Sequence, residues 1–92
     1  MAKIYVPGKD KGKIMLYALS TCPWCGKTKR LLGEMGVGYE FEDVDLLEGD
    51  ARQQSIHEVS RWNPDASFPV LVIDNKRSIV GFREDEIRKA LA

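Results

Sequence analysis

The chain has 92 residues, enough for one small domain, and its 14 basic residues balance its 14 acidic residues. A net charge of zero argues against a general nucleic-acid-binding protein, and no apolar run is long enough to cross a membrane. The first seven residues lack the long apolar core of a secretion signal, so we expect a cytoplasmic protein in a reducing compartment.

Residues 1–12 form a short N-terminal extension of a single predicted domain that spans residues 1–92. Residues 3–6 are compatible with a short edge strand, and residues 7–12 are a polar connector that we expect to be mobile. Residues 14–19 follow as the first well-defined strand, because nearly all of them are apolar, as in a strand buried on both faces.

A helix is predicted from residue 23 to about residue 35, since Leu31, Leu32 and Met35 recur at helical spacing. Gly36 directly follows the last of these residues and is a typical helix terminator. The first strand therefore passes into the first helix through a very short connection.

The second half of the chain alternates between strands and helices. Residues 39–45 show a strand-like alternation that breaks near Asp43. Residues 48–62 have a helical pattern with Ala51, Ile56 and Val59 on the inner side. The remaining predicted elements are a loop at 63–67, a strand at 69–73, a hairpin turn at 74–76, a returning strand at 78–80 and a helix at 83–91.

This order of elements, β-α-β-α-β-β-α, predicts an α/β fold. The first two well-defined strands flank a helix, so they should be parallel and joined by a right-handed crossover. The last two strands should form an antiparallel hairpin. We therefore expect a mixed four-stranded sheet with helices on both faces.

The only two cysteines, Cys22 and Cys25, lie where the first strand passes into the first helix. Pro23 suits the first helical position, because its missing N–H and fixed φ cost nothing there. Cys22 then caps the helix and faces unpaired N–H groups that favour a thiolate. Cys25 follows one turn later, close enough to form a disulfide. The pair is typical of a redox site in which Cys22 attacks and Cys25 resolves.

A metal site is one alternative for a cysteine pair. Zinc requires four ligands, and the single histidine, His57, lies far along the chain on the outer side of a predicted helix, so we predict no metal. The pair lies in the basic part of the chain, since residues 1–30 hold seven Lys or Arg and one acid. Trp24 either folds over the helix or is an exposed contact for a partner protein. Lys27, with Lys29 and Arg30, belongs either to an ordinary solvated helix face or to a contact surface for an acidic partner.

Three elements in order resemble the thioredoxin superfamily and, in their compactness, the glutaredoxins. They are Cys22-Pro23-Trp24-Cys25 after the first strand, Phe68-Pro69 before the third and Gly81 before the last helix. The resemblance covers residues 14–91 and implies a thioredoxin-like fold. It also implies that the Phe68–Pro69 peptide bond is cis and that Pro69 faces the redox sulfurs.

The stretch Gly81-Phe82-Arg83-Glu84-Asp85 is similar to the Gly-Phe-Arg-x-Asp signature of NrdH-type redoxins, which take electrons from a reductase protein. Common glutaredoxins have Thr-Val before the proline that corresponds to Pro69, and a second glycine directly after the one that corresponds to Gly81. In those proteins these residues hold glutathione. Phe68 and Phe82 stand at those positions here, so the resemblance disfavours a glutathione site. Trp24 in turn departs from the residues that NrdH proteins usually carry between the cysteines.

The resemblance implies a dithiol–disulfide oxidoreductase that reduces protein disulfides, ribonucleotide reductase among the candidate substrates. The expected electron donor is a thioredoxin-reductase-like or ferredoxin-dependent reductase, and the expected redox group is a Cys22–Cys25 disulfide with no bound cofactor. We expect a monomer. A glutathione-dependent glutaredoxin, an iron–sulfur cluster carrier and a redox-inert adaptor stay open as alternatives. The predicted partner-binding residues are Pro23, Trp24, Lys27, Phe68, Pro69, Gly81 and Phe82.

Overall fold

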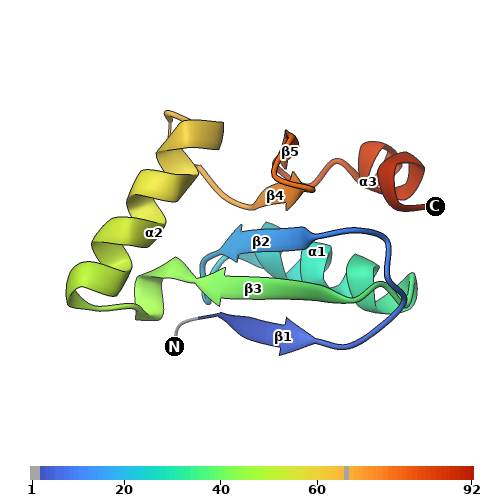
Figure 1. Cartoon of the computed structure of the whole chain (residues 1–92), viewed down its shortest axis with the longest axis horizontal. Coiled ribbons are helices and arrows are strands. Elements are labelled where there is room, and N and C mark those ends of the chain that lie inside the picture. Colours follow the sequence, from blue (N-terminus) through green and yellow to red (C-terminus); the bar gives the residue numbers. More distant parts are fainter. Residues whose placement is uncertain (1–2, 66) are drawn as a thin grey trace.

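A mixed sheet of five strands, in the order β1-β3-β2-β4-β5, forms the centre of the molecule (Figure 1). The computed structural model describes residues 3–65 and 67–92. β2 and β3 are parallel, and the other neighbouring strands are antiparallel. The strands are β1 (Ile4–Val6), β2 (Ile14–Ala18), β3 (Tyr39–Asp43), β4 (Val70–Ile73) and β5 (Arg77–Val80).

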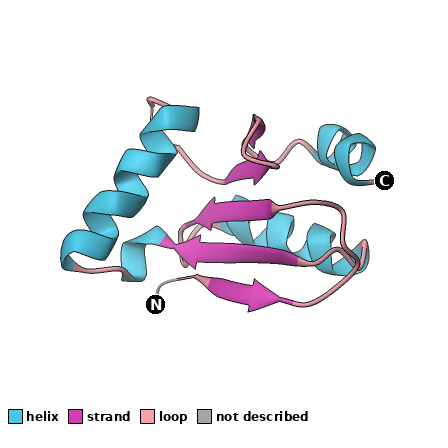
Figure 2. Ribbon diagram, in the orientation of Figure 1, coloured by secondary structure: helices cyan, strands magenta, loops and turns pink. Residues whose placement is uncertain are grey.

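Helices cover both faces of this sheet, as Figure 2 shows. The helices are α1 (Pro23–Glu34), α2 (Gly49–Trp62) and α3 (Glu84–Leu91), with a short 3₁₀ turn, η1 (Val44–Leu46), between β3 and α2. α1 and α3 share the larger core with one face of the sheet, whereas α2 and Val44 of η1 pack on the other face. Within residues 3–65 and 67–92, none of the helices has the length and apolar character needed to span a membrane.

The α/β class and the order of the predicted elements are confirmed, but the sheet has five strands rather than four. The fifth strand is β1, the segment that the sequence marked as compatible with a short edge strand, and its Ile4 lies opposite Phe41 in an antiparallel pair with β3. A three-residue segment carries little sequence pattern of its own. It joins the sheet because the outer edge of β3 offers unpaired backbone groups that it can bond.

The connector between β1 and β2 is also bound to the rest of the fold. The Lys9 N–H donates to the carbonyl of Gly36 at 2.8 Å, and the Gly38 N–H donates to the carbonyl of Lys9 at 2.9 Å. Gly8 lies against the same turn, where a Cβ atom would come within 2.6 Å of the Gly38 nitrogen. The connector therefore follows the turn that ends α1.

The predicted helical phase of α2 is wrong for two residues. Val59 is buried as expected, but Ala51 is exposed and Ile56 is 40% exposed. Ser55 is buried instead, beside the carboxylate of Glu42 on β3. The inward face of α2 thus includes a polar residue, which an apolar-periodicity argument does not count.

Candidate active site

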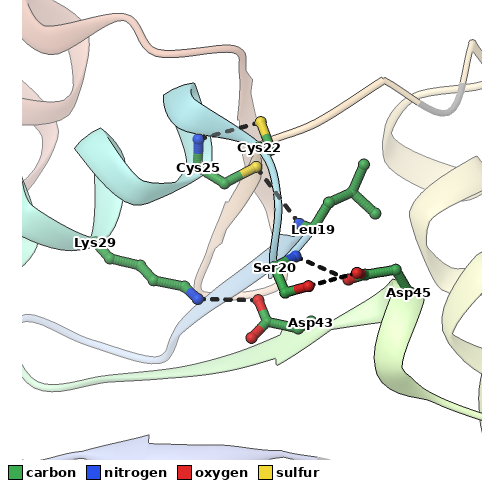
Figure 3. Close-up of polar contacts among 7 residues, drawn as sticks. All are labelled: Leu19, Ser20, Cys22, Cys25, Lys29, Asp43 and Asp45. Atoms are coloured by element: carbon green, nitrogen blue, oxygen red, sulfur yellow. Dashed lines mark hydrogen bonds and ion pairs between the residues drawn. The ribbon is translucent and has the colours of Figure 1, made fainter.

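Cys22 and Cys25 occupy the junction between β2 and α1 (Figure 3). Cys22 is the N-cap of α1, and Pro23 stands at the first helical position, as predicted. The backbone N–H of Cys25 donates to the Cys22 sulfur at 3.3 Å, so one unpaired donor of the helix start serves that sulfur. Cys22 is partly exposed, whereas Cys25 is fully buried. Only Cys22 can therefore meet a partner first.

Cys25 lies in the larger core, directly behind Cys22. The Leu19 N–H donates to its sulfur at 3.5 Å. Burial, reinforced by a hydrogen bond with Cys22, raises the pKa of the Cys25 thiol to about 12, although the Leu19 N–H and the positive charge of Lys29 act in the lowering direction. Cys25 is therefore a protonated thiol at neutral pH, able to supply a proton.

Two acidic residues hold the β2–α1 connection in place. Asp45 accepts hydrogen bonds from the N–H and the hydroxyl of Ser20 at 2.8 and 2.5 Å, which lower the pKa of its carboxyl group. The Lys29 ammonium lies 2.9 Å from the Asp43 carboxylate. Neither contact was predicted from the sequence. The available signal was the run of acidic residues after residue 40, which could have been matched with the basic face of the first helix.

Three of the predicted partner-binding residues form one exposed aromatic and basic surface. Trp24 is 54% exposed and stacks on Phe82, with ring centroids 6.1 Å apart and 26° between the ring planes. The Lys27 ammonium lies 4.4 Å from the centroid of the Trp24 ring. The first turn of α1 and the segment before α3 are thus joined beside the cysteines.

The remaining predicted residues lie at the start of β4 and the end of β5. The Phe68–Pro69 peptide bond is cis, as the family resemblance implied. The Gly81 N–H donates to the Pro69 carbonyl at 2.8 Å, and Gly81 has φ +83°, a conformation that favours glycine. Phe68 is partly buried and contacts both cores. His57, in contrast, is exposed on α2.

Taken together, the site has an accessible sulfur at a helix start, a second sulfur that is protonated behind it, and an exposed aromatic surface alongside. Such a pair can exchange with an external disulfide and then close on itself.

The glutaredoxin family model matches residues 14–78 of the chain. A glutaredoxin-like 8.6 kDa protein encoded in the rubredoxin operon of Clostridium pasteurianum is 33% identical over 78 residues, which cover 85% of this chain and 96% of that protein.

Two solved structures from Methanosarcina species are similar over nearly the whole chain. Methanoredoxin from Methanosarcina acetivorans is 50% identical with a TM-score of 0.90, and the match covers 92% of this chain and 90% of that one. A glutaredoxin from Methanosarcina mazei Go1 is 46% identical with a TM-score of 0.92, covering 100% and 89%.

The predicted likeness to NrdH-type redoxins is supported as well. The NrdH-redoxin of Escherichia coli, a glutaredoxin-like protein with a thioredoxin-like activity profile, is 28% identical with a TM-score of 0.65. That match covers 84% of this chain and 92% of the other.

Proposed function

The chain belongs to the glutaredoxin family of thiol–disulfide oxidoreductases, and from this premise we propose that it reduces protein disulfides through Cys22 and Cys25, with electrons from a protein reductase. One observation carries the proposal: the Cys22 sulfur caps α1, accepts the Cys25 N–H at 3.3 Å and is partly exposed, while Cys25 is buried behind it. This asymmetry gives each sulfur a separate role.

The exchange proceeds in two steps. The Cys22 thiolate attacks one sulfur of the substrate disulfide, a mixed disulfide forms, and the other substrate sulfur leaves as a thiolate. The Cys25 thiol then transfers its proton toward the sulfur that leaves and attacks the Cys22 sulfur, which closes the Cys22–Cys25 disulfide. The substrate gains two electrons and the oxidoreductase loses two. A reductase must then return two electrons to the site.

The choice of a protein reductase rather than glutathione rests on Phe82. Its ring stacks on Trp24. The benzyl group therefore occupies space next to Gly81 that the second glycine of the common glutaredoxin pattern would leave open. A small tripeptide would lose that space, whereas a protein surface can use the exposed Trp24 indole and the partly exposed Phe82 ring as contact area. Phe68, Pro69 and Gly81 complete the proposed partner-binding surface, since the Gly81–Pro69 hydrogen bond joins its two ends.

Ribonucleotide reductase is the substrate that we propose, by analogy with NrdH-redoxin, and a thioredoxin-reductase-like or ferredoxin-dependent enzyme is the proposed donor. A reducing, cytoplasmic compartment belongs to the same proposal, because a dithiol site of this kind is kept reduced there.

The test offers the oxidised protein three donor systems: glutathione with its reductase, thioredoxin reductase with NADPH, and a ferredoxin-dependent reductase. We expect efficient reduction by a protein reductase and weak turnover with glutathione. Robust activity with glutathione alone would contradict the donor assignment. A visible absorption band in protein purified without oxygen would instead support an iron–sulfur cluster carrier.

Substitution of each cysteine tests the assigned roles. Cys25→Ser should accumulate the mixed disulfide with the substrate, because no second thiol is left to resolve it, and non-reducing gels and mass spectrometry would detect the adduct. Cys22→Ser should neither form the adduct nor reduce the substrate. Reductase activity in Cys22→Ser would contradict the assignment.

A further inference from the structure

A small hollow of about 210 Å³ opens between the β2–α1 connection, η1 and α2. Most of the side chains that line it are apolar, namely Leu19, Val44, Ile56, Val59 and Phe68. The two valines are buried, Leu19 and Phe68 are partly buried, and Ile56 is exposed. We call this site the Leu19 hollow. Its lining includes neither the cysteines nor the stacked aromatic pair beside them.

The Leu19 hollow adjoins the redox site through the residue that gives it its name. The Leu19 carbonyl accepts the Cys22 N–H at 3.2 Å, and the Leu19 N–H donates to the Cys25 sulfur at 3.5 Å. The Leu19 side chain points away from both cysteines and toward α2 (Figure 3). Phe68, on another wall of the hollow, directly precedes Pro69 and packs against the core that includes Cys25. The hollow is therefore continuous with the surface that a partner disulfide must reach.

The charged residues of the hollow balance each other. Arg52 and Asp45 are the charged side chains in its lining, and both are exposed. Asp45 already accepts two hydrogen bonds from Ser20, one from the N–H and one from the hydroxyl. Since the two charges are of opposite sign and the rest of the lining is apolar, the hollow favours an uncharged, apolar group.

The size of the hollow limits what can occupy it. Pockets that bind small molecules usually measure about 300–1,000 Å³, and this one is smaller. Apolar lining that stays in contact with water gains free energy when an apolar group covers it. A single aliphatic or aromatic side chain meets both requirements. A protein whose disulfide lies against Cys22 brings such side chains with it, because each residue of an extended segment advances the chain by only about 3.3 Å.

We propose that the Leu19 hollow holds an apolar side chain of the protein substrate, from a residue within a few positions of the cysteine that Cys22 attacks. The inference rests on the proposed function and adds a sequence preference to it. The exposed position of Ile56 on α2 then has a role, since its side chain forms part of the wall that the substrate residue contacts.

The test measures single-turnover reduction of disulfide-linked peptide dimers by the full-length protein, reduced beforehand with dithiothreitol that is then removed. No electron donor takes part, so the identity of the reductase does not affect the result. Each peptide has one cysteine with three residues on either side, all glycine except one, which is leucine, serine or glutamate. Leucine in at least one position should raise the rate about tenfold over serine, the scale of burying one aliphatic side chain.

Ile56→Gln tests the hollow itself. The residue is exposed, so the variant should fold, and it should lower the preference for leucine about threefold while the serine peptides react at the same rate. Leu46→Gln is the matched control, because Leu46 is also an exposed apolar residue but does not line the hollow. It should keep the full preference. Melting temperatures would verify that both variants are folded.

Equal rates for the leucine and serine peptides at every position would overturn the inference, as would an equal loss of preference in Ile56→Gln and Leu46→Gln. Faster reduction of the glutamate peptides would also overturn it and would assign the hollow to an acidic side chain on Arg52. The serine peptides report separately on the proposed function. If no dimer is reduced, disulfide reduction itself is contradicted, whereas reduction of all dimers without preference contradicts only the role of the hollow.

Discussion

At the scale of single residues, the two sulfurs share one helical turn but have opposite surroundings. Cys22 has a backbone N–H donor and contact with solvent, whereas Cys25 is enclosed by apolar side chains and interacts with a second sulfur. The second environment disfavours negative charge and raises the pKa of Cys25. The difference comes from the fold alone, since the two residues are chemically identical.

This difference predicts how the stability of the reduced protein depends on pH. The pKa of Cys25 rises from its ordinary value of 9.0 to about 12 in the folded state, so the folded chain binds more protons than the unfolded chain between these values. The stabilising contribution is complete below about pH 9 and is lost as the pH rises toward 12. Denaturant titrations of reduced protein at a series of pH values would measure this loss.

Cys25→Ala supplies the control for that experiment. The variant lacks the buried thiol, so its stability should fall less steeply above pH 9. Tyr17 and Tyr39, whose pKa values burial also raises, contribute a loss of the same sign in both proteins. Parallel stability curves for the two proteins would contradict the prediction.

At the scale of elements, two glycines close together in the fold should respond to alanine in opposite ways. Gly33 lies in α1 with open space around its Cα, so Gly33→Ala should stabilise the protein by about 0.5–1 kcal/mol through better helix propensity. A Cβ atom added to Gly8 would lie 2.6 Å from backbone atoms of Val37 and Gly38, so Gly8→Ala should destabilise the protein by about 1–3 kcal/mol. Urea unfolding midpoints would measure both, and a neutral Gly8→Ala would show that the connector can move aside.

The elements that could be predicted from sequence pattern alone are those with a long apolar run or a sustained helical periodicity. The apolar run of β2 predicted a buried strand, and the periodicity of α1 predicted a helix. Because the connection between them is short, the position of the cysteines at the start of the helix could be predicted as well. Ser55 and Glu42 could not be predicted as buried, because each is buried by pairing with the other across two elements. The stacking of Trp24 on Phe82 joins residues distant in sequence, and only the folded chain brings them together.

At the scale of the whole molecule, the basic side chains beside the redox site should guide acidic partners toward it. Lys27 and Arg30 are exposed and line a shallow hollow of about 240 Å³ together with Phe82, Glu34 and Glu84. Of the two basic residues, Lys27 lies over the Trp24 ring and so is next to the cysteines. Lys27→Gln should lower kcat/KM toward an acidic partner about threefold at low salt, with less effect at high salt, because screening removes the same attraction. Rates measured across a range of NaCl concentrations would check this.

Lys76→Gln provides the matched control for the charge. It removes one exposed positive charge at the β4–β5 turn, away from the residues that line this hollow. We expect it to leave kcat/KM nearly unchanged. An equal loss in both variants would mean that overall charge, and not the surface beside the site, controls the encounter.

The antiparallel pairing of β1 with β3 has a consequence for aggregation. β3 is five residues long, and without β1 its outer backbone groups would form an open edge able to recruit a strand from another molecule. Removal of residues 1–12 should therefore turn a protein that resists edge-to-edge assembly into one that self-associates. Sedimentation velocity over a range of protein concentrations would detect the assemblies, and a shortened chain that stays a single species would show that β3 can protect its own edge.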